Sequence, residues 1–396
     1  MLSAMPQENP LDGFQVTEQL YEDPENRVMR ATETASGREV TLRQMVGPGE
    51  RREHILREAE ILAGLSHPHV VKVHQVLTKD EDVWLVLEPL PKRSLFDRTV
   101  EQKRFEPRYA AELVGQVLAA LQAADKAGMG RRSVQPETVL LRGDHDVVLA
   151  DFAFHQLRTK RTESPYTVPP ELLAGSLRSN LAADMWSLGV LLYICTEGAP
   201  PFNGSEDRKI LDRVKIGTYK APRNSGPLLT DTIRRMLTYS PGQRIAPQDA
   251  AGELAIAAEP EREVAEECVE AFEKLKRAQG RGYVMYKIND AGTQIVVDAA
   301  DLKGTYDDAV SRLPESECRY AVIPLQVETT PGKLCTETLF VRWLPKKAPS
   351  REQMRYTDPS MVTLKTRLGD VLEVLVDERS ELDHDAVVQE LRRQTG

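Results

Sequence analysis

The residues from 148 to 153 read Val148-Leu149-Ala150-Asp151-Phe152-Ala153, an apolar run that ends at an acidic and an aromatic residue. Two further stretches follow it, Pro169-Pro170-Glu171 and Asp184-Met185-Trp186-Ser187-Leu188-Gly189. The second of these lies inside an apolar pattern that predicts a helix over residues 182–196, and helical spacing also recurs over residues 106–127. We therefore expect a mainly helical region around these stretches.

Short apolar runs occupy the chain before this region, from residue 14 onward. Examples are Val40-Thr41-Leu42 and Val83-Trp84-Leu85-Val86-Leu87, which have the length and composition of strands. One helical pattern, over residues 51–65, interrupts these runs. This part of the chain is therefore predicted to be a small, strand-rich lobe that holds one helix.

The chain has the composition of an ordinary globular protein, with 396 residues of which 41% are hydrophobic and 29% charged. This length predicts two to three domains at roughly 150 residues each. There is no apolar run of the ~18 residues that a membrane helix needs, and the N-terminus has no apolar signal core. We therefore expect a cytoplasmic protein without a membrane partner. The four cysteines form no CxxC pairs, so we expect neither a metal site nor a disulfide framework, and no cofactor.

The net charge of −9, from 52 basic and 61 acidic residues, argues against nucleic acid as a partner. Residues 1–258 contain 32 basic and 35 acidic residues, and residues 259–396 contain 20 and 26, so the acidic excess is larger in the second part. The boundary, Glu259-Pro260-Glu261-Arg262, is too short for a flexible tether. We predict a tail at 1–13 and two closely coupled modules at 14–258 and 259–396.

After residue 258 the pattern alternates between helix and strand. Helices are expected over residues 261–276, near 306–313, from Ser350 onward and over 383–393. Strands are expected over residues 283–288, 294–297, 320–327, 338–343 and 371–376. Asp358-Pro359 interrupts the helix from Ser350, because proline has no amide hydrogen and disfavours helix at the residue before it. Either that helix kinks or a second helix begins there.

The first module resembles the protein kinase family, because five of its stretches match the kinase signature in order and spacing. These stretches are residues 57–62 with 65–68, 148–153, 169–171, 184–189 and 241–244. The resemblance places Glu58 at the glutamate of the regulatory helix and Asp151 at the metal-binding aspartate. It also implies that Arg244 pairs with Glu171. The module is therefore expected to have a bilobal protein-kinase-like fold.

The positions that would hold the nucleotide differ from the family pattern. Aligned on Val28, the three glycine positions hold Tyr21, Asp23 and Asn26. Side chains at these positions obstruct the approach of the backbone to phosphate, and a carboxylate repels the phosphates. The strand motif V-A-I-K reads Val40-Thr41-Leu42-Arg43, so Arg43 replaces the lysine that would pair with Glu58.

The catalytic loop differs further. The family motif H-R-D-L-K-P-E-N reads Arg131-Arg132-Ser133-Val134-Gln135-Pro136-Glu137-Thr138. Ser133 replaces the acid that would accept the substrate proton, Gln135 replaces the lysine, and Thr138 replaces the metal-binding asparagine. A hydroxyl group is not a base near pH 7. We therefore predict a pseudokinase, which is not an enzyme although it retains Glu58 and Asp151.

The second module is similar to the ADF/cofilin homology domain over residues 261–395. Three stretches follow the order and nearly the spacing of that family: Cys318-Arg319-Tyr320-Ala321, Phe340-Val341-Arg342-Trp343 and the residues from Ala348-Pro349 to Tyr356. The resemblance implies a mixed central sheet flanked by helices, giving a two-module α+β chain. It also implies actin, as monomer or filament, as the partner, and association with the cytoskeleton.

The resemblance places the actin contact on the helix that begins at Ala348-Pro349. Arg351 and Met354 match its basic residue and its methionine, and Gln353 stands where a second lysine is expected. The other predicted contacts are Arg355, Lys365, Arg367, Lys333 in the loop expected at 329–336, and Arg392. Residues 342–367 contain seven basic and two acidic residues, so the sequence predicts a positively charged face suited to acidic actin.

These features predict a non-catalytic actin-binding regulatory protein, in which a pseudokinase module is coupled to a cofilin-like domain that modulates filament turnover. Gln353 raises an alternative, a scaffold whose cofilin-like domain binds a non-actin partner or an actin nucleator. A second alternative is an atypical protein serine/threonine kinase. A regulatory protein that docks on the kinase-like module is a further expected partner.

Overall fold

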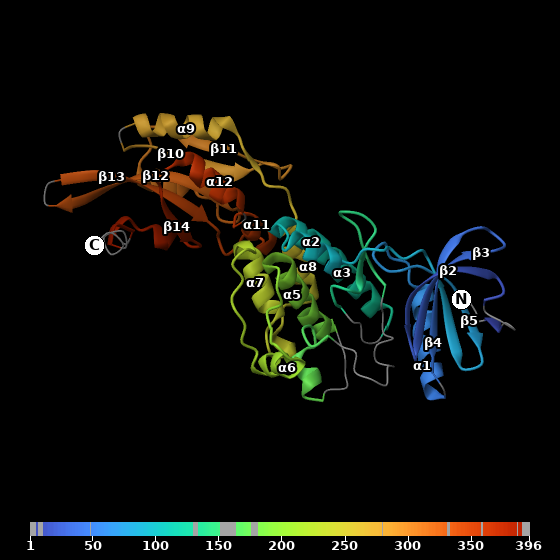
Figure 1. Ribbon diagram of the computed structural model, residues 1–396. Helices are drawn as coiled ribbons and strands as arrows, with labels where there is room; N and C mark the ends of the chain where they lie inside the picture. Colours follow the sequence, from blue (N-terminus) through green and yellow to red (C-terminus); the bar gives the residue numbers. More distant parts are fainter. Residues whose placement is uncertain are drawn as a thin grey trace. The chain divides into compact units, whose positions relative to one another are not determined.

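The computed structural model describes residues 5–6, 11–47, 49–129, 134–150, 164–175, 181–278, 280–330, 333–357, 359–385 and 387–389. At residues 5, 6, 328–330, 333, 334 and 359 it describes the backbone alone. The chain divides into two compact units, Met1–Ala258 and Glu259–Gly396. Each unit has its own six-stranded sheet (Figure 1). Buried hydrophobic clusters lie within each unit.

Unit 1 begins with a sheet that carries one helix. The strands are β1 Met5–Pro6, β2 Phe14–Asp23, β3 Asn26–Glu33, β4 Glu39–Val46, β5 Val73–Lys79 and β6 Asp82–Leu87. Their order is β1-β5-β6-β4-β3-β2, and all neighbours pair antiparallel except β1 and β5. Helix α1 Glu50–Gly64 packs against β5 and β6 through buried residues that include Ile55 and Leu62. The structure thus matches the strand-rich lobe with one helix that the apolar runs predict.

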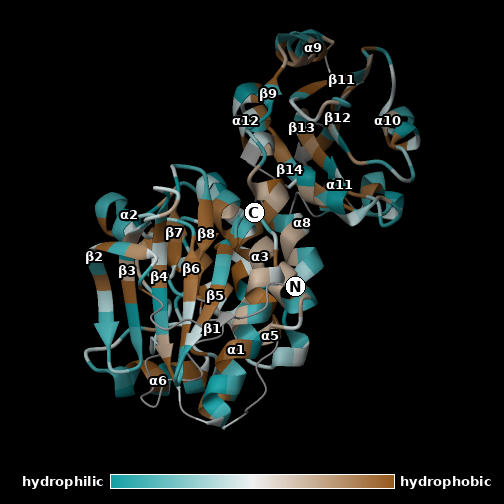
Figure 2. Ribbon diagram, turned by 90° about the vertical axis from the view of Figure 1, so that its right-hand side faces the viewer, coloured by the Kyte–Doolittle hydropathy of each residue, from teal (hydrophilic) through white to brown (hydrophobic). Residues whose placement is uncertain are grey.

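Burial in this sheet follows the position of each strand. Strand β6, inside the sheet, buries five of its six residues, whereas the edge strand β2 exposes most of its residues. Figure 2 shows the same contrast, with β5 and β6 largely hydrophobic and β2 hydrophilic. A central strand is covered on both faces, so it needs apolar side chains throughout.

The rest of unit 1 is mainly helical, as the apolar spacing predicts. Its helices are α2 Leu95–Gln102, α3 Pro107–Lys126, α4 Pro170–Leu173, α5 Leu181–Glu197, α6 Asp207–Ile216, α7 Gly226–Met236 and α8 Pro247–Ala257, with a 3₁₀ turn, η2, at Pro241–Gln243. A two-stranded ribbon of β7 Val139–Leu141 and β8 Val147–Leu149 pairs antiparallel. A capping box starts α2, because the Ser94 hydroxyl accepts the Asp97 amide hydrogen and the Asp97 carboxylate accepts that of Ser94.

Helix α5 lies at the centre of the helical part and is buried on nearly every side. Gly189 allows close packing there, because a Cβ at this position would stand 2.7 Å from the Cβ of Met236. Trp186 is buried near the start of α5 and stacks on Phe202, with 5.4 Å between the ring centroids. Within the ranges that the structure describes, no helix combines the length and the hydrophobicity needed to cross a membrane.

Arg244 and Glu171 form the ion pair that the sequence predicts. The two terminal nitrogens of Arg244 each donate to one Glu171 carboxylate oxygen at 2.7 Å, and only 1% of the Arg244 side chain is exposed. Arg244 also donates to the carbonyl oxygens of Ala182, at 2.7 Å, and Thr238, at 2.9 Å. Its guanidinium carbon lies 5.1 Å from the ring centroid of Trp186. This arginine therefore joins α4, α5 and the segment after α7.

Unit 2 is built on a mixed sheet with the order β14-β13-β12-β10-β11-β9. Its strands are β9 Glu263–Val264, β10 Tyr283–Ile288, β11 Gln294–Asp301, β12 Arg319–Thr330, β13 Lys333–Trp343 and β14 Leu372–Val376. The edge strands β9 and β14 pair in parallel with their neighbours, and the other pairs are antiparallel. Pairing of β12 with β13 extends to Thr330 and Lys333, so both strands run into the loop expected at 329–336.

Helices flank this sheet, as the sequence predicts. They are α9 Glu266–Arg277, α10 Tyr306–Arg312, α11 Ser350–Arg355 and α12 Pro359–Leu368, with a 3₁₀ turn, η3, at Arg379–Leu382. Residues 384, 385 and 387–389 are also helical, within the helix expected over 383–393. Alternate residues of β12 enter two cores: Tyr320 and Val322 pack in one, and Ala321 and Ile323 in the other.

The start of one helix differs from the expectation drawn from sequence. The helix expected over 261–276 begins only at Glu266, because Val264 is extended and pairs with Ile295 of β11. This pairing buries Val264 in the core, which local helical spacing alone does not reveal.

Of the two possibilities left open at Asp358-Pro359, the structure has a second helix, since α12 starts at Pro359. Proline suits a first helical position because the amide hydrogen it lacks would have no partner there.

One of the four cysteines should react quickly with a thiol reagent in the folded chain. Cys195, Cys268 and Cys318 are buried, whereas Cys335 is partly exposed. Burial raises the pKa of Cys268 to about 12 and that of Cys318 to about 12, and it also raises the pKa of Cys195. Since the thiolate is the reactive species, these three thiols should be inert at pH 8.

The number of fast-reacting thiols can be measured by absorbance with a disulfide reagent such as Ellman's reagent. We expect one fast equivalent in the folded chain, four in denaturant, and loss of the fast equivalent in Cys335→Ser. Two or more fast equivalents in the folded chain would contradict the burial described.

Candidate functional site

The hairpin of β2 and β3 carries the three positions at which the kinase resemblance expects glycines. Asp23 closes its turn, because Oδ1 accepts the amide hydrogens of Glu25, at 2.8 Å, and Asn26, at 2.7 Å. The Tyr21 hydroxyl donates to Oδ2 of Asp23 at 2.7 Å. Pro24, which lies between Asp23 and Glu25, has no amide hydrogen. Amide groups of the turn thus bind an internal carboxylate where the resemblance expects a loop that covers phosphates.

Arg43 and Glu58 are both buried, with exposed fractions of 7% and 4%. Arg43 lies on β4, paired with Val28 of β3 and Leu85 of β6. Glu58 lies on the buried face of α1, and its Oε1 is 4.0 Å from Nε2 of His54. Charged side chains are rarely buried to this extent unless other groups compensate their charge. The two charges expected beside the nucleotide are therefore held inside the strand-rich lobe.

Gln135 and Thr138 bind each other across a local turn. The Thr138 hydroxyl donates to the Gln135 carbonyl oxygen at 3.0 Å and accepts the Gln135 amide hydrogen at 3.1 Å. Such side-chain bonds to nearby backbone stabilise turns. The other two predicted positions, Ser133 and Asp151, lie outside the described residues.

Of the two positions at which the resemblance expects metal ligands, only Thr138 lies among the described residues. The Thr138 hydroxyl is already bonded on both sides to the main chain of Gln135. Across the described ranges, no three His, Cys, Asp or Glu side chains gather closely enough to hold a metal. In this arrangement Thr138 stabilises the turn.

Replacing Asp23 should strengthen the binding of ATP. Asp23→Gly frees two amide hydrogens and removes a negative charge, so we expect an affinity for ATP increased by about fivefold or more. Asp23→Asn keeps an acceptor for the turn and removes only the charge, so we expect a smaller gain. Isothermal calorimetry of the full chain with ATP and with adenosine measures both effects.

Glu39→Gln provides the matched control, because Glu39 is exposed and starts β4 at the end of the sheet away from the turn. Binding of adenosine should not change in any of the three variants. A gain for ATP that is equal in Glu39→Gln, or absent in Asp23→Gly, would show that Asp23 does not limit phosphate binding.

In unit 2, helix α11 carries the central predicted actin contacts and is anchored by buried groups. Oε1 of Glu352 accepts the Cys318 amide hydrogen at 2.7 Å. The Tyr356 hydroxyl accepts the Ile288 amide hydrogen at 2.9 Å, and the Tyr320 hydroxyl donates to the Tyr356 carbonyl oxygen at 3.2 Å. The Cys318–Tyr320 region of the resemblance thus supports α11 from within the core.

Arg351 and Met354 lie on the accessible part of α11. Arg351 is exposed and Met354 is half-buried. Among the ion pairs of the described residues, none involves Arg351. Arg351 therefore keeps its charge available to a partner.

The basic residues of the positively charged face expected over 342–367 differ in their surroundings. Six of its seven basic residues form ion pairs with carboxylates from elsewhere in unit 2. The pairs are Arg342 and Lys365 with Glu373, Lys346 with Asp377 and Glu378, Lys347 with Glu315, Arg355 with Glu259, and Arg367 with Glu266. Folding therefore brings a carboxylate next to six of these seven cations.

The remaining predicted contacts have different surroundings. The Gln353 amide nitrogen donates to the carbonyl oxygens of Pro345, at 3.1 Å, and Ala348, at 3.0 Å, so it holds the loop before α11. Lys333 begins β13, and its side chain lies outside the description. Arg392 also lies outside the described residues. Of the predicted contacts whose side chains are described, Arg351 and Met354 are thus the two on α11 that are neither ion-paired nor bonded to the loop before it.

Sequence reasoning missed the segment that runs beside α11 and α12. Glu259 pairs with Arg355 of α11 at 2.7 Å and with the fully buried Arg262. The Arg262 amide donates to the Ser360 hydroxyl at 3.1 Å, and Arg367 donates to the Val264 carbonyl oxygen at 2.7 Å. Except for the Glu259–Arg262 pair, these contacts join residues about 100 positions apart, and nothing in the local sequence indicates them.

Comparison with known proteins identifies the class to which this fold and site belong. Residues 23–253 match the family model of the protein kinase domain. This match covers more than half of the chain, so the chain belongs to the protein kinase family. Residues 262–392 match the model of the cofilin/tropomyosin-type actin-binding proteins. The chain thus consists of a protein kinase domain followed by a cofilin/ADF domain, which confirms the predicted two-module α+β fold.

Curated relatives match the kinase part. NUAK family SNF1-like kinase 1 of Homo sapiens is 28% identical over 248 residues, which is 60% of this chain and 37% of the relative. NUAK family SNF1-like kinase 2 of Rattus norvegicus is 29% identical over 248 residues, 60% of this chain and 39% of the relative. Carbon catabolite-derepressing protein kinase of Secale cereale is 32% identical over 213 residues, which is 51% of this chain and 42% of the relative. The chain spans about two fifths of the length of these relatives.

The relatives correct the prediction that the chain is not an enzyme. Each of them is named as a kinase, and the similarity extends over the whole kinase-like part rather than over isolated motifs. The prediction gave decisive weight to three catalytic-loop positions. Phosphoryl transfer depends mainly on the positioning of substrates and on charge stabilisation, to which many other residues contribute. The substitutions at Ser133, Gln135 and Thr138 therefore do not justify excluding activity.

Proposed function

We propose that this chain is an actin-associated protein serine/threonine kinase, in which residues 14–258 transfer phosphate and residues 259–396 bind actin. The observation that carries the proposal is the presence of both family matches in one chain, a protein kinase domain and an actin-binding cofilin/ADF domain. The kinase similarity to NUAK and SNF1-like kinases supports the first activity. The actin-binding activity would place the chain at the cytoskeleton.

The residues retained in the kinase domain support a slow phosphotransfer. Glu58 and the positive charge of Arg43 are buried in the strand-rich lobe, and Asp151 is kept in the sequence. Ser133 cannot take a proton from the substrate as a carboxylate does, so proton transfer has no dedicated base. Since a general base typically contributes about 10²–10⁴-fold, a slow rate is expected rather than none.

Phosphotransfer from radiolabelled ATP to serine and threonine peptides tests the kinase activity. The purified full chain should label the peptide, and Asp151→Asn should abolish the label. Glu39→Gln, an exposed change in the same lobe, should leave the label unchanged. Labelling that survives in Asp151→Asn would indicate a contaminating kinase, and absence of labelling in the wild-type chain would contradict the proposal.

The cofilin/ADF domain is proposed to bind actin through α11, with Arg351 and Met354 as its contacts. Arg355, Lys365 and Arg367 are proposed to contribute less directly, because each is paired with a carboxylate. The same pairing favours the second candidate, a scaffold that uses this domain for a non-actin partner. Co-sedimentation with filamentous actin and gel filtration with monomeric actin separate the two, because a scaffold of that kind would bind neither.

A further inference from the structure

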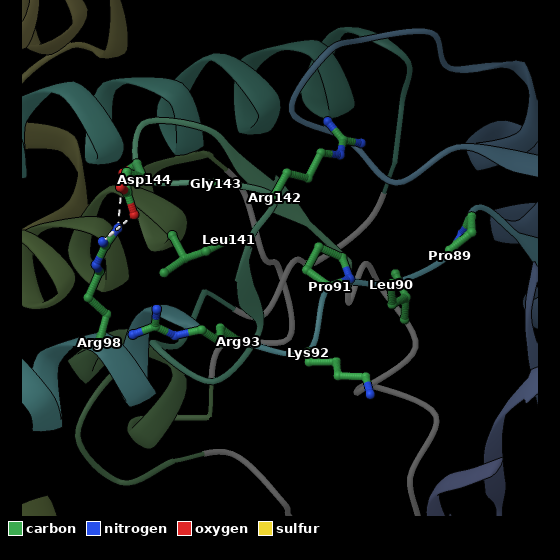
Figure 3. A pocket seen from close by; sticks show the side chains of 10 residues that line it. All are labelled: Pro89, Leu90, Pro91, Lys92, Arg93, Arg98, Leu141, Arg142, Gly143 and Asp144. Atoms are coloured by element: carbon green, nitrogen blue, oxygen red, sulfur yellow. Dashed lines mark hydrogen bonds and ion pairs between the residues drawn. The ribbon is translucent and has the colours of Figure 1, made fainter.

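A pocket of about 520 Å³ lies in unit 1 between the segment after β6, helix α2 and the turn from β7 to β8 (Figure 3). Its apolar lining consists of Pro89, Leu90, Pro91 and Leu141. These residues lie outside the positions assigned to nucleotide or actin. The pocket therefore has the size and the apolar surface to receive a short segment of another molecule.

The charged lining of the pocket is mostly basic. It consists of Lys92, Arg93, Arg98 and Arg142, with Asp144 as the acidic member. In Figure 3 Arg93 and Arg98 lie on the same side of the pocket, and dashed lines join Arg98 to Asp144. Arg142 is held by Glu88 at 2.6 Å, so the cations that remain for a ligand are Lys92, Arg93 and Arg98. The prolines and leucines of the lining favour contact with apolar groups.

Arg98 is the buried cation of this pocket, with only 10% of its side chain exposed. Nη1 donates to the Tyr109 hydroxyl at 2.6 Å and to the Asp144 carbonyl oxygen at 3.1 Å, and Nη2 pairs with the Asp144 carboxylate. Its Nε is buried and has no acceptor within the described part of the chain. A buried donor without an acceptor is costly, so a ligand oxygen at Nε would be favourable.

The rim of the pocket can exchange its partners for those of a ligand. Lys92 is exposed and pairs with no carboxylate of the described residues, and Arg93 pairs with Glu101, whose side chain is 57% exposed. An ion pair that is exposed on both sides contributes little to stability, so an incoming carboxylate can replace Glu101 on Arg93 at small cost.

We propose that this pocket is a docking site for an acidic peptide segment of a partner protein. Carboxylates of the peptide lie on Lys92, Arg93 and the Nε of Arg98, and an apolar side chain between them packs on Leu90 and Leu141. A free phosphate ion would use the cations and leave the apolar lining uncovered, which favours the peptide. The proposal does not depend on phosphotransfer or on actin binding.

Fluorescence anisotropy of the full chain with a labelled peptide, Glu-Asp-Leu-Glu-Asp-Leu-Glu, tests the proposal at about 0.15 M salt. We expect saturable binding that weakens by at least about tenfold in Lys92→Glu/Arg93→Glu. The matched control is Lys209→Glu/Lys215→Glu, which reverses two exposed cations on α6 and should change the affinity by less than about twofold. The peptide with Gln and Asn in place of its acids should not bind, and the peptide with Ser in place of Leu should bind more weakly.

Arg98→Gln tests the buried contact and should weaken binding while the melting temperature is followed in parallel. If Arg98→Gln does not fold, Lys92→Glu/Arg93→Glu decides the proposal, since both residues are exposed. Equal loss in the α6 control, equal binding of the Gln/Asn peptide, or absence of saturable binding would overturn it. Displacement of the peptide by inorganic phosphate at equal concentration would also overturn it, in favour of an anion site.

Discussion

Arg244→Ala should lower the free energy of unfolding of unit 1 by about 3–5 kcal/mol, because it leaves the carboxylate of Glu171 without its buried partner. The arginine is almost fully buried and also bonds to the carbonyl oxygens of Ala182 and Thr238. Those acceptors would lose their donors as well, which adds to the cost. At roughly 2–4 °C per kcal/mol for a unit of this size, the melting temperature should fall by about 10 °C.

Tryptophan fluorescence during thermal unfolding measures this effect, since Trp186 lies beside Arg244. Arg234→Ala is the matched control, because Arg234 pairs with Asp231 on the exposed surface of α7 and should change the melting temperature little. Glu171→Ala should also destabilise the chain. The double variant should lose clearly less than the sum of the two, because each single change leaves a buried charge without its partner. Additive losses would mean that Arg244 and Glu171 stabilise the unit independently, without a favourable interaction between them.

Arg351→Ala/Met354→Ala should weaken binding to filamentous actin by about 1–4 kcal/mol, or about tenfold or more, if α11 is the centre of the contact. Arg351 is the basic residue of the 342–367 face that no described ion pair engages, so its charge is not already neutralised. Met354 beside it adds an apolar anchor. Neither residue is buried, so the variant should fold normally.

Lys274→Ala/Leu302→Ala is a matched control, because it removes an exposed cation from α9 and an exposed apolar side chain just after β11. Co-sedimentation over a range of actin concentrations should separate the two variants. A loss that is equal in both would remove α11 as the specific contact. Normal binding by Arg351→Ala/Met354→Ala would place the actin contact elsewhere in the domain.

Several local features of the fold could be predicted from sequence because their signals span only a few residues. The helix at α5 and the strand at β10 follow from apolar spacing, and both lie close to their predicted positions. The pair of Arg244 with Glu171 could also be predicted, since each lies in a recognisable stretch. The strand β9 could not, because Val264 is extended only through its pairing with Ile295, about 30 residues away.

The candidate sites were less accessible to sequence reasoning. The sequence indicated a basic face over 342–367, but Glu259, Glu315 and Glu373 reach it only after folding. It also indicated substituted glycine positions, but not that Asp23 would bind the amide hydrogens of the turn. Substituted catalytic positions led to a prediction of no activity, which the similarity of the whole domain to kinases corrects.

The amino-acid sequence by itself determined the two modules, their helices and strands, and the motif residues that lie in their cores. These depend on periodicity and on stretches of a few residues, so each is encoded locally. Only the tertiary structure decided which charges remain available, such as Arg351, and which are neutralised, such as Arg355. Coulombic and hydrogen-bonding partners act over a few ångströms in space, and here they come from residues that are often 30 to 100 positions apart in the chain.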